Sequence, residues 1–353
     1  MAPTRVVCDG RALGDASALR GVGTYLRQLL AQLATRSDVE VTALVRPGVP
    51  LPPGVGRLAL RRLAPDRWAT AEHHLLLPRD LARGGADVAH SPALDPPRRC
   101  STPWVQTIHD VLPLAVSDPA LAVERRRWRR FAPRVRTAAA VITPSAHSAG
   151  QAVELLGVDP SRVHVVPHGV DPRFRPGCGD RDRYLLMVAE YGPHKGFAEA
   201  AEVARLLAAA GVDHELRITG RVAAPNRHAV EAAVAGSPVR LLGWVPDLLP
   251  HYQRASVLIV PSRHEGFGLP ALEAMATATP VVAFANTATS EVVADGGILV
   301  PDGDTAAMAG AVGHLLADPA AWKQASEAAA RRATRFDWAK SAEAHAEIFR
   351  SVA

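Results

Sequence analysis

The sequence predicts an α/β protein with two Rossmann-like domains, each a parallel sheet wound by helices. Its 353 residues exceed what one hydrophobic core usually supports. Short β-branched runs alternate with amphipathic helical patterns along the chain, which is typical of parallel sheets covered by helices. The alternation stops at residues 169–182, a stretch dense in proline, glycine and charge, and then restarts. We therefore expect two parallel sheets that face a central cleft.

The first domain is assigned to residues 1–172. A strand at residues 5–8 is followed by Gly21 and Gly23, which lead into a helix with leucines on one face. The other strands of this domain are expected at residues 39–45, 87–90, 104–109, 140–143 and 164–167.

The second domain is assigned to residues 173–335, with a helix at residues 197–210. Its strands are expected at residues 184–188, 215–219, 239–242, 257–260, 281–284 and 298–300. A last helix, within residues 336–353, can pack back on the first domain or stay with the second. Because open α/β sheets bind ligands at the carboxyl ends of their strands, we expect the functional site in the cleft.

The composition limits the class of protein. Apolar residues make up 48% and charged residues 21%, as in ordinary globular proteins. The three cysteines form no CxxC pair, which argues against a disulfide framework and fits a reducing compartment. No stretch approaches the roughly 20 apolar residues of a membrane span, and the first ten residues hold no apolar signal core. We therefore predict a cytoplasmic protein.

A basic helix is predicted within residues 124–136. Residues 1–172 hold 22 arginines against 15 acidic residues, and five of these arginines lie between Arg125 and Arg130. Trp128, Phe131 and Val135 recur at helical spacing while the arginines occupy the other face. Two interpretations stay open: a solvated helix face, and a surface for anionic membrane lipid or an acidic acceptor. Nucleic acid is not expected, because no recognised binding motif accompanies the charge.

The stretch with the strongest chemical signal is VLIVPSRHEGFGLPALEAMA at residues 257–276. An apolar strand ends at Pro261, a glycine-rich loop follows, and Pro270 suits the first position of a helix. Glycines let backbone amides approach a ligand, and a helix amino terminus favours phosphate. Glu265 and Glu273, the latter expected in the first helical turn, can accept hydrogen bonds from sugar hydroxyls. Alternatively, the two carboxylates only complement the helix dipole.

The stretch closely resembles the E-x7-E donor-site signature of glycosyltransferase family 4. Segments elsewhere agree in order, among them DGRALGDASALRGVGTYLRQLL near the start, TIHDVLPL at 107–114, VAEYGPHKG at 188–196 and LLGWVPD at 241–247. The resemblance covers nearly the whole chain. It implies the two-domain GT-B architecture, a nucleotide-sugar donor, transfer with retention of anomeric configuration, and no divalent metal.

The resemblance also implies roles for individual residues. Glu273 is expected on the donor ribose and Lys195 on the donor diphosphate. Glu265 and the amides of the loop are expected to hold the transferred sugar and the distal phosphate. His109 is expected to contact that sugar near the reacting carbon. The remaining predicted donor-site residues are glycines and neighbours in the two glycine-rich segments: Gly21, Gly23, Gly266, Phe267, Gly268 and Leu269.

These assignments have structural alternatives. Lys195 fits an exposed loop lysine, and His109 fits a satisfied structural histidine at a strand end. Asp110 either orients His109 or caps the following turn. The scattered histidines show no metal-ligand spacing, so no metal site or cofactor is expected.

The chain departs from the family pattern at Glu190. Many members carry an arginine there, and a carboxylate would repel a diphosphate. Glu190 must therefore point away, pair with a cation, or contact a sugar hydroxyl, while Arg217 or Arg221 can supply the missing charge. Because relatives that use mannose donors can lack this arginine, GDP-mannose is favoured over UDP- or dTDP-sugars.

The sequence offers no carboxylate clearly placed as a nucleophile. We therefore expect a same-face reaction in which the leaving phosphate takes the acceptor's proton. The predicted acceptor is a glycan, a lipid-linked sugar or a small molecule. The alternative functions are a nucleotide-sugar 2-epimerase and a non-catalytic partner subunit.

Overall fold

A computed structural model describes residues 2–60, 78–81, 83–92 and 101–353. Internal contacts divide the chain into two compact units. Unit 1 comprises Met1–Gly169 together with Asp337–Ala353, and unit 2 comprises Val170–Phe336. Each unit is built on one sheet, and every strand pairing in both sheets is parallel.

The sheet of unit 1 has the strand order β3-β2-β1-β4-β5-β6-β7. The order reverses between β1 and β4, which is the topological switch point of this sheet. The strands are β1 Thr4–Asp9, β2 Val39–Val45, β3 Gly56–Ala59, β4 Val88–Ser91, β5 Trp104–Thr107, β6 Ala140–Thr143 and β7 Val163–Val165. Three of them, β4, β5 and β6, are buried at every residue, as expected for a sheet covered on both faces.

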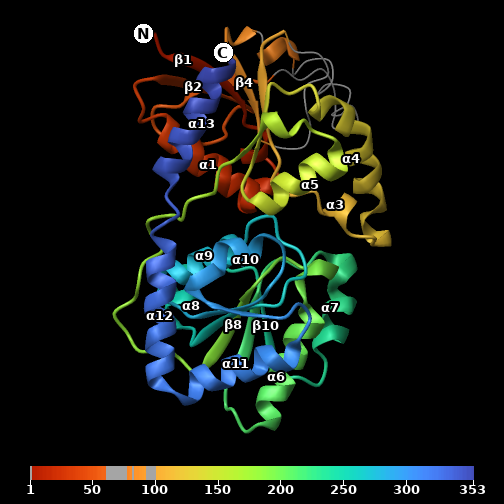
Figure 1. Ribbon diagram of the computed structural model, residues 1–353, viewed down its shortest axis with the longest axis vertical. Coiled ribbons are helices and arrows are strands. Elements are labelled where there is room, and N and C mark those ends of the chain that lie inside the picture. Colours follow the sequence, from red (N-terminus) through yellow and green to blue (C-terminus); the bar gives the residue numbers. More distant parts are fainter. Residues whose placement is uncertain (1, 61–77, 82, 93–100) are drawn as a thin grey trace. The chain divides into compact units, whose positions relative to one another are not determined.

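Helices cover both faces of this sheet (Figure 1). On one face lie α1 (Gly21–Leu33) and α13 (Trp338–Val352), which pack against each other. On the other face lie α4 (Ala122–Val135) and α5 (Ala146–Leu156), whereas α3 (Leu112–Ala115) is a single short turn. The last helix of the chain therefore belongs to the core of unit 1, although it follows unit 2 in sequence.

The sheet of unit 2 has the strand order β10-β9-β8-β11-β12-β13 and reverses between β8 and β11. The strands are β8 Tyr184–Val188, β9 Glu215–Thr219, β10 Val239–Gly243, β11 Val257–Val260, β12 Val281–Phe284 and β13 Ile298–Val300. One face packs on α6 (Phe197–Ala209), α7 (Arg227–Val234) and α11 (Thr305–Ala317). The other packs on α8 (Leu249–Arg254), α9 (Leu269–Ala276), α10 (Thr287–Val293) and α12 (Pro319–Ala333).

Three details differ from the sequence predictions. Strand β3 was not expected, because residues 56–59 are largely exposed and carry no run of apolar residues. Strand β5 ends at Thr107, so His109 lies in the following loop and not at the end of the strand. Helix α9 begins at Leu269, which places Glu273 in its second turn and not in its first.

Candidate functional site

The predicted diphosphate lysine and the first predicted glutamate lie at the switch point of unit 2. Lys195 follows β8, in a 3-10 turn spanning Pro193–Lys195, and Glu265 lies in the loop after β11. Strands β8 and β11 are neighbours. Because their carboxyl ends meet at one edge, the sheet brings together two residues separated by 70 positions.

Lys195 and Glu265 form a close ion pair. The Lys195 Nζ lies 2.8 Å from each carboxylate oxygen of Glu265. The side chains are 21% and 15% exposed, so the pair is sheltered but open to a ligand. Burial raises the pKa of Glu265, but the charge and hydrogen bonds of Lys195, with a hydrogen bond from Ser262, outweigh it and lower this pKa. The Glu265 carboxyl is therefore ionised at neutral pH.

Gly196 allows the two loops to approach. It has φ +73°, and a Cβ there would lie 2.0 Å from the Pro261 carbonyl oxygen. The loops are also joined by the Arg263 amide, which donates to the His194 carbonyl at 2.8 Å. Any side chain at Gly196 would push the Lys195 turn away from the Glu265 loop.

The Glu265 loop is anchored from β12 and α10. The Glu265 amide donates to the Thr287 hydroxyl at 3.1 Å, and Asn286 Nδ2 donates to the Ser262 carbonyl at 2.9 Å. Thr287 has φ +44°, a left-handed conformation that β-branched residues rarely adopt. This strained residue lies in contact with the loop of the candidate site, where such strain tends to concentrate.

The glycine-rich loop leads directly into helix α9. Gly268 precedes the helix with φ +100°, and Leu269 and Pro270 begin it. Phe267 is buried edge-on against Phe336, which fixes the loop to the core. Gly266 lies between Glu265 and Phe267, where the chain passes the ion pair. A small pocket beside the loop is bordered by β8, β11 and the start of α9. The sheltered amides at this helix start are suited to an anion.

Glu273 lies one turn further along α9. Its Oε2 accepts a hydrogen bond of 2.8 Å from the Tyr252 hydroxyl. Burial raises the pKa of Glu273 to about 7, opposed by the Tyr252 hydrogen bond and the charge of Arg173. Unlike Glu265, this carboxyl therefore titrates near neutral pH.

Neither proposed substitute for the missing arginine lines the pocket beside the glycine-rich loop. Arg217 is paired with Glu215 at 2.8 Å, and its guanidinium lies 4.1 Å from the ring centre of Tyr184, near the amino end of the sheet. Arg221 follows β9 at the carboxyl edge, where its guanidinium lies 5.3 Å from the ring centre of the half-exposed Trp244. Of the two, Arg221 is on the side of the sheet where Lys195 lies.

The other predicted residues belong to unit 1. Gly21 and Gly23 form the first turn of α1. A Cβ on Gly23 would lie 2.4 Å from the Ser17 carbonyl oxygen, so packing alone requires glycine there. The predicted donor contacts of both glycines remain predictions.

His109 lies in a buried group of aromatic side chains. Its Nε2 donates to the Pro92 carbonyl at 3.1 Å, which leaves Nδ1 to accept from His168 Nε2 at 3.4 Å. The Tyr25 ring lies 4.7 Å from His109, and Trp338 of α13 stacks on His168. Burial lowers the pKa of His109 to about 4, opposed by the charge of Asp110 and the bond to Pro92. His109 is therefore neutral at physiological pH.

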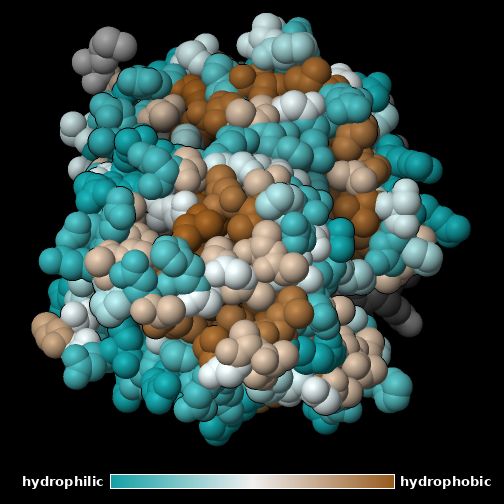
Figure 2. All heavy atoms as spheres, turned by 60° about the horizontal axis from the view of Figure 1, so that its bottom comes forward, coloured by the Kyte–Doolittle hydropathy of each residue, from teal (hydrophilic) through white to brown (hydrophobic). Residues whose placement is uncertain are grey.

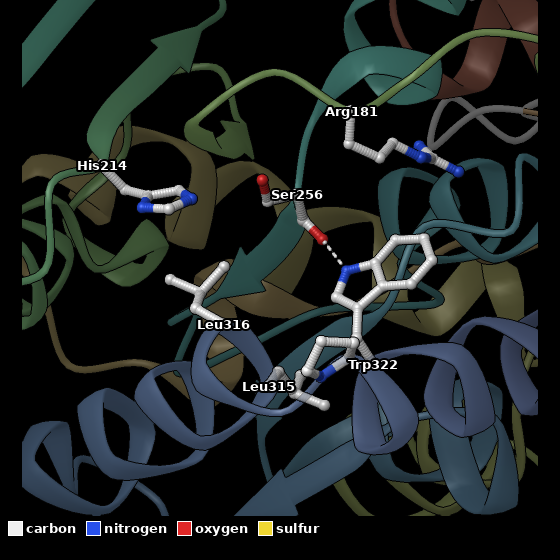
Figure 3. A pocket seen from close by; sticks show the side chains of 7 residues that line it. Arg181, His214, Ser256, Leu315, Leu316 and Trp322 are labelled. Carbon is white, nitrogen blue, oxygen red and sulfur yellow. Dashed lines mark hydrogen bonds between the residues drawn. The ribbon is translucent and has the colours of Figure 1, made fainter.

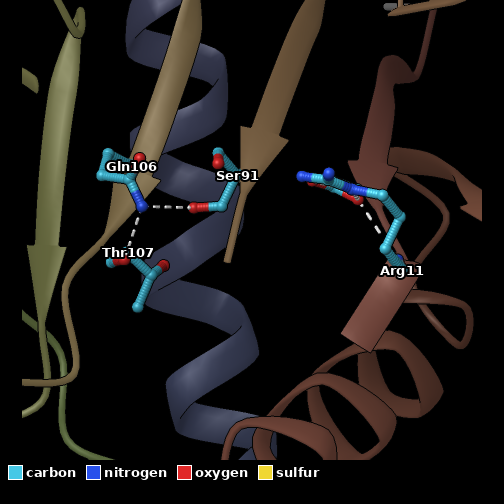
Figure 4. Close-up of polar contacts among 5 residues, drawn as sticks. Arg11, Ser91, Gln106 and Thr107 are labelled. Carbon is cyan, nitrogen blue, oxygen red and sulfur yellow. Dashed lines mark hydrogen bonds and ion pairs between the residues drawn. The ribbon is translucent and has the colours of Figure 1, made fainter. Parts of the chain in front are cut away.

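The polar groups around the carboxyl ends of β1, β4 and β5 are paired with one another (Figure 4). Arg11 binds the buried Asp9 carboxylate, with Nη2 2.6 Å from Oδ2. Gln106 Nε2 donates to the carbonyls of Ser91 at 3.0 Å and Thr107 at 2.7 Å. Asp110 caps the following turn by accepting from the Leu112 amide at 2.9 Å, which favours the capping alternative for this residue.

A second pocket, of about 300 Å³, lies at the amino edge of the unit 2 sheet (Figure 3). Two of the polar side chains that border it are used internally, whereas Nδ1 of His214 is buried without a hydrogen-bond partner among the described residues. Trp322 Nε1 donates to the Ser256 carbonyl, and Arg181 donates to carbonyls of residues 252, 255, 277 and 278. Figure 2 brings this end of unit 2 forward and shows apolar residues interspersed with hydrophilic ones. We assign this pocket a structural role.

Neither a metal-binding cluster nor a membrane-spanning helix occurs in the described part of the chain. Among the described residues, no three His, Cys, Asp or Glu side chains are placed to hold a metal ion together. None of the described helices is both long and apolar enough to span a bilayer.

Comparison with solved structures identifies the class of protein from its fold. The chain superposes on sucrose-phosphate synthase from Thermosynechococcus elongatus with a TM-score of 0.79 and 21% identity, over 99% of each chain. It superposes on Anabaena HepE, solved in complex with UDP and glucose, with a TM-score of 0.75 and 16% identity, over 99% of this chain and 100% of that one. The chain has the GT-B architecture of glycosyltransferases.

Sequence relatives identify the family. Residues 19–174 match the family model described as Glycosyltransferase Family 4, and residues 182–318 match Glycosyl transferases group 1. The D-inositol 3-phosphate glycosyltransferase of Frankia alni is 33% identical over 297 residues, which are 73% of this chain and 72% of that protein. This chain belongs to glycosyltransferase family 4, as its sequence motifs predict.

Two further relatives differ in their named activity. The D-inositol 3-phosphate glycosyltransferase of Acidothermus cellulolyticus is 32% identical over 72% of this chain and 63% of that protein. The MMP alpha-(1->4)-mannosyltransferase of Mycolicibacterium hassiacum is 31% identical over 60% of this chain and 55% of that protein. The chain spans less than two thirds of the length of both.

Three residues of the site were not predicted from the sequence. Tyr252, Thr287 and His168 contact Glu273, Glu265 and His109, respectively. The only available signal was the position of Thr287 and His168 inside segments that match the family. Tyr252 also lies within the matched residues 182–318, but its apolar helix position predicts a core residue.

Proposed function

We propose that this protein transfers a hexose from a nucleoside diphosphate sugar to a hydroxyl of its acceptor, with retention and without a metal ion. One observation carries the proposal: the Lys195–Glu265 pair lies at the switch point of unit 2, beside the glycine-rich start of α9. A lysine and the amides at a helix amino terminus can bind the two phosphates of a nucleoside diphosphate. A carboxylate can accept hydrogen bonds from the hydroxyls of the sugar.

Donor binding requires an exchange of partners at the ion pair. The diphosphate takes the Lys195 ammonium, which releases the Glu265 carboxylate to accept hydrogen bonds from the transferred sugar. Glu273 accepts from the ribose hydroxyls of the nucleotide. Because Lys195 and Glu265 are charged and held in place beforehand, little reorganisation is needed when charge develops on the leaving phosphate.

The transfer step is a same-face displacement at C1 of the sugar. The bond between C1 of the sugar and the phosphate oxygen breaks while the acceptor oxygen bonds C1 on the same face. The acceptor's proton passes to the departing phosphate oxygen, and nucleoside diphosphate is released. Lys195 stabilises the charge on that phosphate. The neutral His109 exchanges its bond to Pro92 or to His168 for one to the sugar, and it adds no positive charge near C1.

GDP-mannose is the donor we favour. Glu190 replaces the arginine of many family members, and one relative is named as a mannosyltransferase. UDP-sugars are the alternative, since HepE was solved with UDP. The names of the other relatives make D-inositol 3-phosphate an acceptor to test first.

A donor panel tests the proposal. In a thermal-shift assay with GDP-mannose, UDP-glucose and dTDP-glucose, one of the three nucleotide sugars should raise the Tm. Incubated with the protein without an acceptor, the same nucleotide sugar should be hydrolysed slowly and release its nucleoside diphosphate. Activity should survive excess EDTA. Sugar interconversion without nucleotide release would indicate an epimerase, and binding without turnover would indicate a partner subunit. Loss of activity on chelation, restored by magnesium or manganese, would contradict metal independence.

A further inference from the structure

Helix α8 presents one tyrosine to the carboxylate of Glu273. The Tyr252 hydroxyl donates to Glu273 Oε2 at 2.8 Å, and Tyr252 itself is fully buried. A phenylalanine would fill the same space in the apolar core around it. The hydroxyl is therefore needed for its hydrogen bond and not for packing, because burying a polar group costs free energy unless it is paired.

The tyrosine is itself held from three sides. Its ring packs edge-on against Phe174 with centroids 5.7 Å apart. Its carbonyl oxygen accepts from Arg181 Nη1 and from the Thr279 hydroxyl, both at 2.7 Å. A side chain with few rotatable bonds, fixed at its backbone and its ring, points its hydroxyl in a single direction.

The charges that face Glu273 come from the segment after β7. Arg173 lies near the carboxylate and carries its own partners, Asp171 at 3.6 Å and Asp247 at 3.7 Å. Since Arg173 is shared between these two aspartates, Tyr252 makes the direct hydrogen bond that the structure gives to the Glu273 side chain.

We propose that Tyr252 is a positioning residue for nucleotide binding: its hydroxyl fixes Oε2 of Glu273, so that the carboxylate is aligned to accept both ribose hydroxyls of the donor. The inference rests on the proposed function, because it assigns Glu273 to the ribose. Each carboxylate oxygen can accept two hydrogen bonds. The bond from Tyr252 uses one acceptor position of Oε2, so this bond leaves one position on Oε2 and both positions on Oε1 for the donor. A vicinal diol offers two donors at a fixed spacing, which only a carboxylate in one orientation can accept together.

The arrangement also sets the pH at which Glu273 ionises. Burial raises its pKa to about 7, Tyr252 and Arg173 act against this, and Asp171 adds to it. Removing the Tyr252 hydroxyl should move the pKa further upward. The ionised form accepts from hydroxyls, so donor binding should weaken as the pH falls through this pKa, and in Tyr252→Phe the weakening should begin at a higher pH.

The test compares Tyr252→Phe with Tyr184→Phe. Tyr184 is equally buried in unit 2, but its hydroxyl donates to the His251 carbonyl at 2.7 Å, away from Glu273. Tyr252→Phe should raise the donor KM roughly tenfold with little change in kcat, as expected for loss of one hydrogen bond to a charged group. It should also move the acid limb of kcat/KM to higher pH. Tyr184→Phe should lower the Tm only.

Two further measurements separate this inference from the proposed function. In a Glu273→Gln background, Tyr252→Phe should no longer affect the donor KM or the binding of GDP and UDP. Without any nucleotide, carbon NMR of the Glu273 carboxyl should show a higher pKa in Tyr252→Phe. An unchanged carboxyl pKa, or an undiminished effect in the Glu273→Gln background, would overturn the positioning role. Failure of the native protein to bind any nucleoside diphosphate would instead refute the proposed function.

Discussion

The two units share one architecture but differ in the chemistry at their switch points. In unit 2 the neighbouring loops hold a charged pair, Lys195 and Glu265, and a carboxyl that titrates near pH 7. In unit 1 the corresponding region holds His109, which burial keeps neutral, among tyrosine, histidine and tryptophan rings. Two of its charged residues, Asp9 and Arg11, are paired with each other.

Under the proposed function, this difference adapts one fold to two ligands. A sheltered lysine and a helix start suit a diphosphate, whereas neutral hydrogen-bonding groups and aromatic rings suit a sugar that gains positive charge during transfer. If this division is correct, substitution of Lys195 or Glu273 in unit 2 should weaken donor binding, whereas substitution of His109 in unit 1 should change turnover alone.

The largest effect is expected for Lys195→Ala. The variant lacks the ammonium group that stabilises the negative charge of the leaving phosphate, so kcat/KM for the donor should fall about 10²–10³-fold. Lys323→Ala, an exposed lysine of α12, is the matched control and should behave as the native protein. Steady-state kinetics with the donor found in the panel would measure both. If folded Lys195→Ala were as active as the native protein, Lys195 would not bind the donor diphosphate.

The two glutamates should divide binding from turnover. Glu265→Ala should lower kcat on the order of tenfold or more, because its bonds to the sugar strengthen in the transition state. Glu273→Ala should raise the donor KM by roughly ten- to a hundredfold at nearly unchanged kcat, since the ribose contacts are the same in both states. Kinetics at saturating acceptor separate these effects. An unchanged kcat in folded Glu265→Ala would contradict the role of the loop in catalysis.

His109→Ala should lower kcat about tenfold or more while leaving the Kd of the nucleoside diphosphate unchanged. Its pKa of about 4 means that His109 is neutral throughout the physiological range. Any acid limb near pH 7 in the native profile should therefore survive in His109→Ala and disappear in Glu273→Gln. Titration calorimetry and a pH series provide the two measurements. Loss of nucleotide affinity in His109→Ala would contradict the assignment of nucleotide binding to unit 2 alone.

A smaller effect is expected on stability. The carboxyl of Glu273 has a raised pKa in the folded protein, so its ionisation opposes folding. The cost is absent below the usual pKa near 4.5, grows as the pH rises, and is complete above about 7. Glu273→Gln should therefore gain about 1–3 kcal/mol at pH 8 and little at pH 4.5, a difference of a few degrees in Tm. Glu231→Gln, on the exposed side of α7, is the control; a gain that is equal at both pH values would refute the raised pKa.

The smallest effect concerns helix α4. Trp128, Phe131 and Val135 are buried, while Arg126, Arg129 and Arg130 face solvent. Arg125 instead donates to the carbonyls of Pro113, Val116 and Asp118, so it is a structural residue.

If the helix meets a membrane, the protein should sediment weakly with anionic vesicles at low salt. It should be released as the screening length falls toward ~8 Å at 0.15 M. Neutralising Arg126, Arg129 and Arg130 together should abolish this binding, and equal sedimentation with neutral vesicles would leave the helix a solvated face.

The sequence determined most of the local structure. β-branched runs and leucine spacing located twelve of the strands named above and the helices between them, because hydrophobic periodicity is a local property. The strand at residues 56–59 was not predicted, because a largely exposed edge strand lacks a run of apolar residues. The E-x7-E loop and its family were also readable, because the motif is a local spacing along the chain. The resemblance then assigned donor-site roles to Lys195, Glu265 and Glu273, and these roles remain predictions.

Only the tertiary structure decided which of these residues meet. The reversal of strand order brings the loops after β8 and β11 together, and this pairing joins Lys195 to Glu265. The partners Tyr252 and His168 likewise come from distant segments, and α13 joins unit 1 although unit 2 precedes it. Burial then gave Glu273 and His109 pKa values that their spacing could not reveal, because desolvation depends on everything packed around a group and not on its neighbours in sequence.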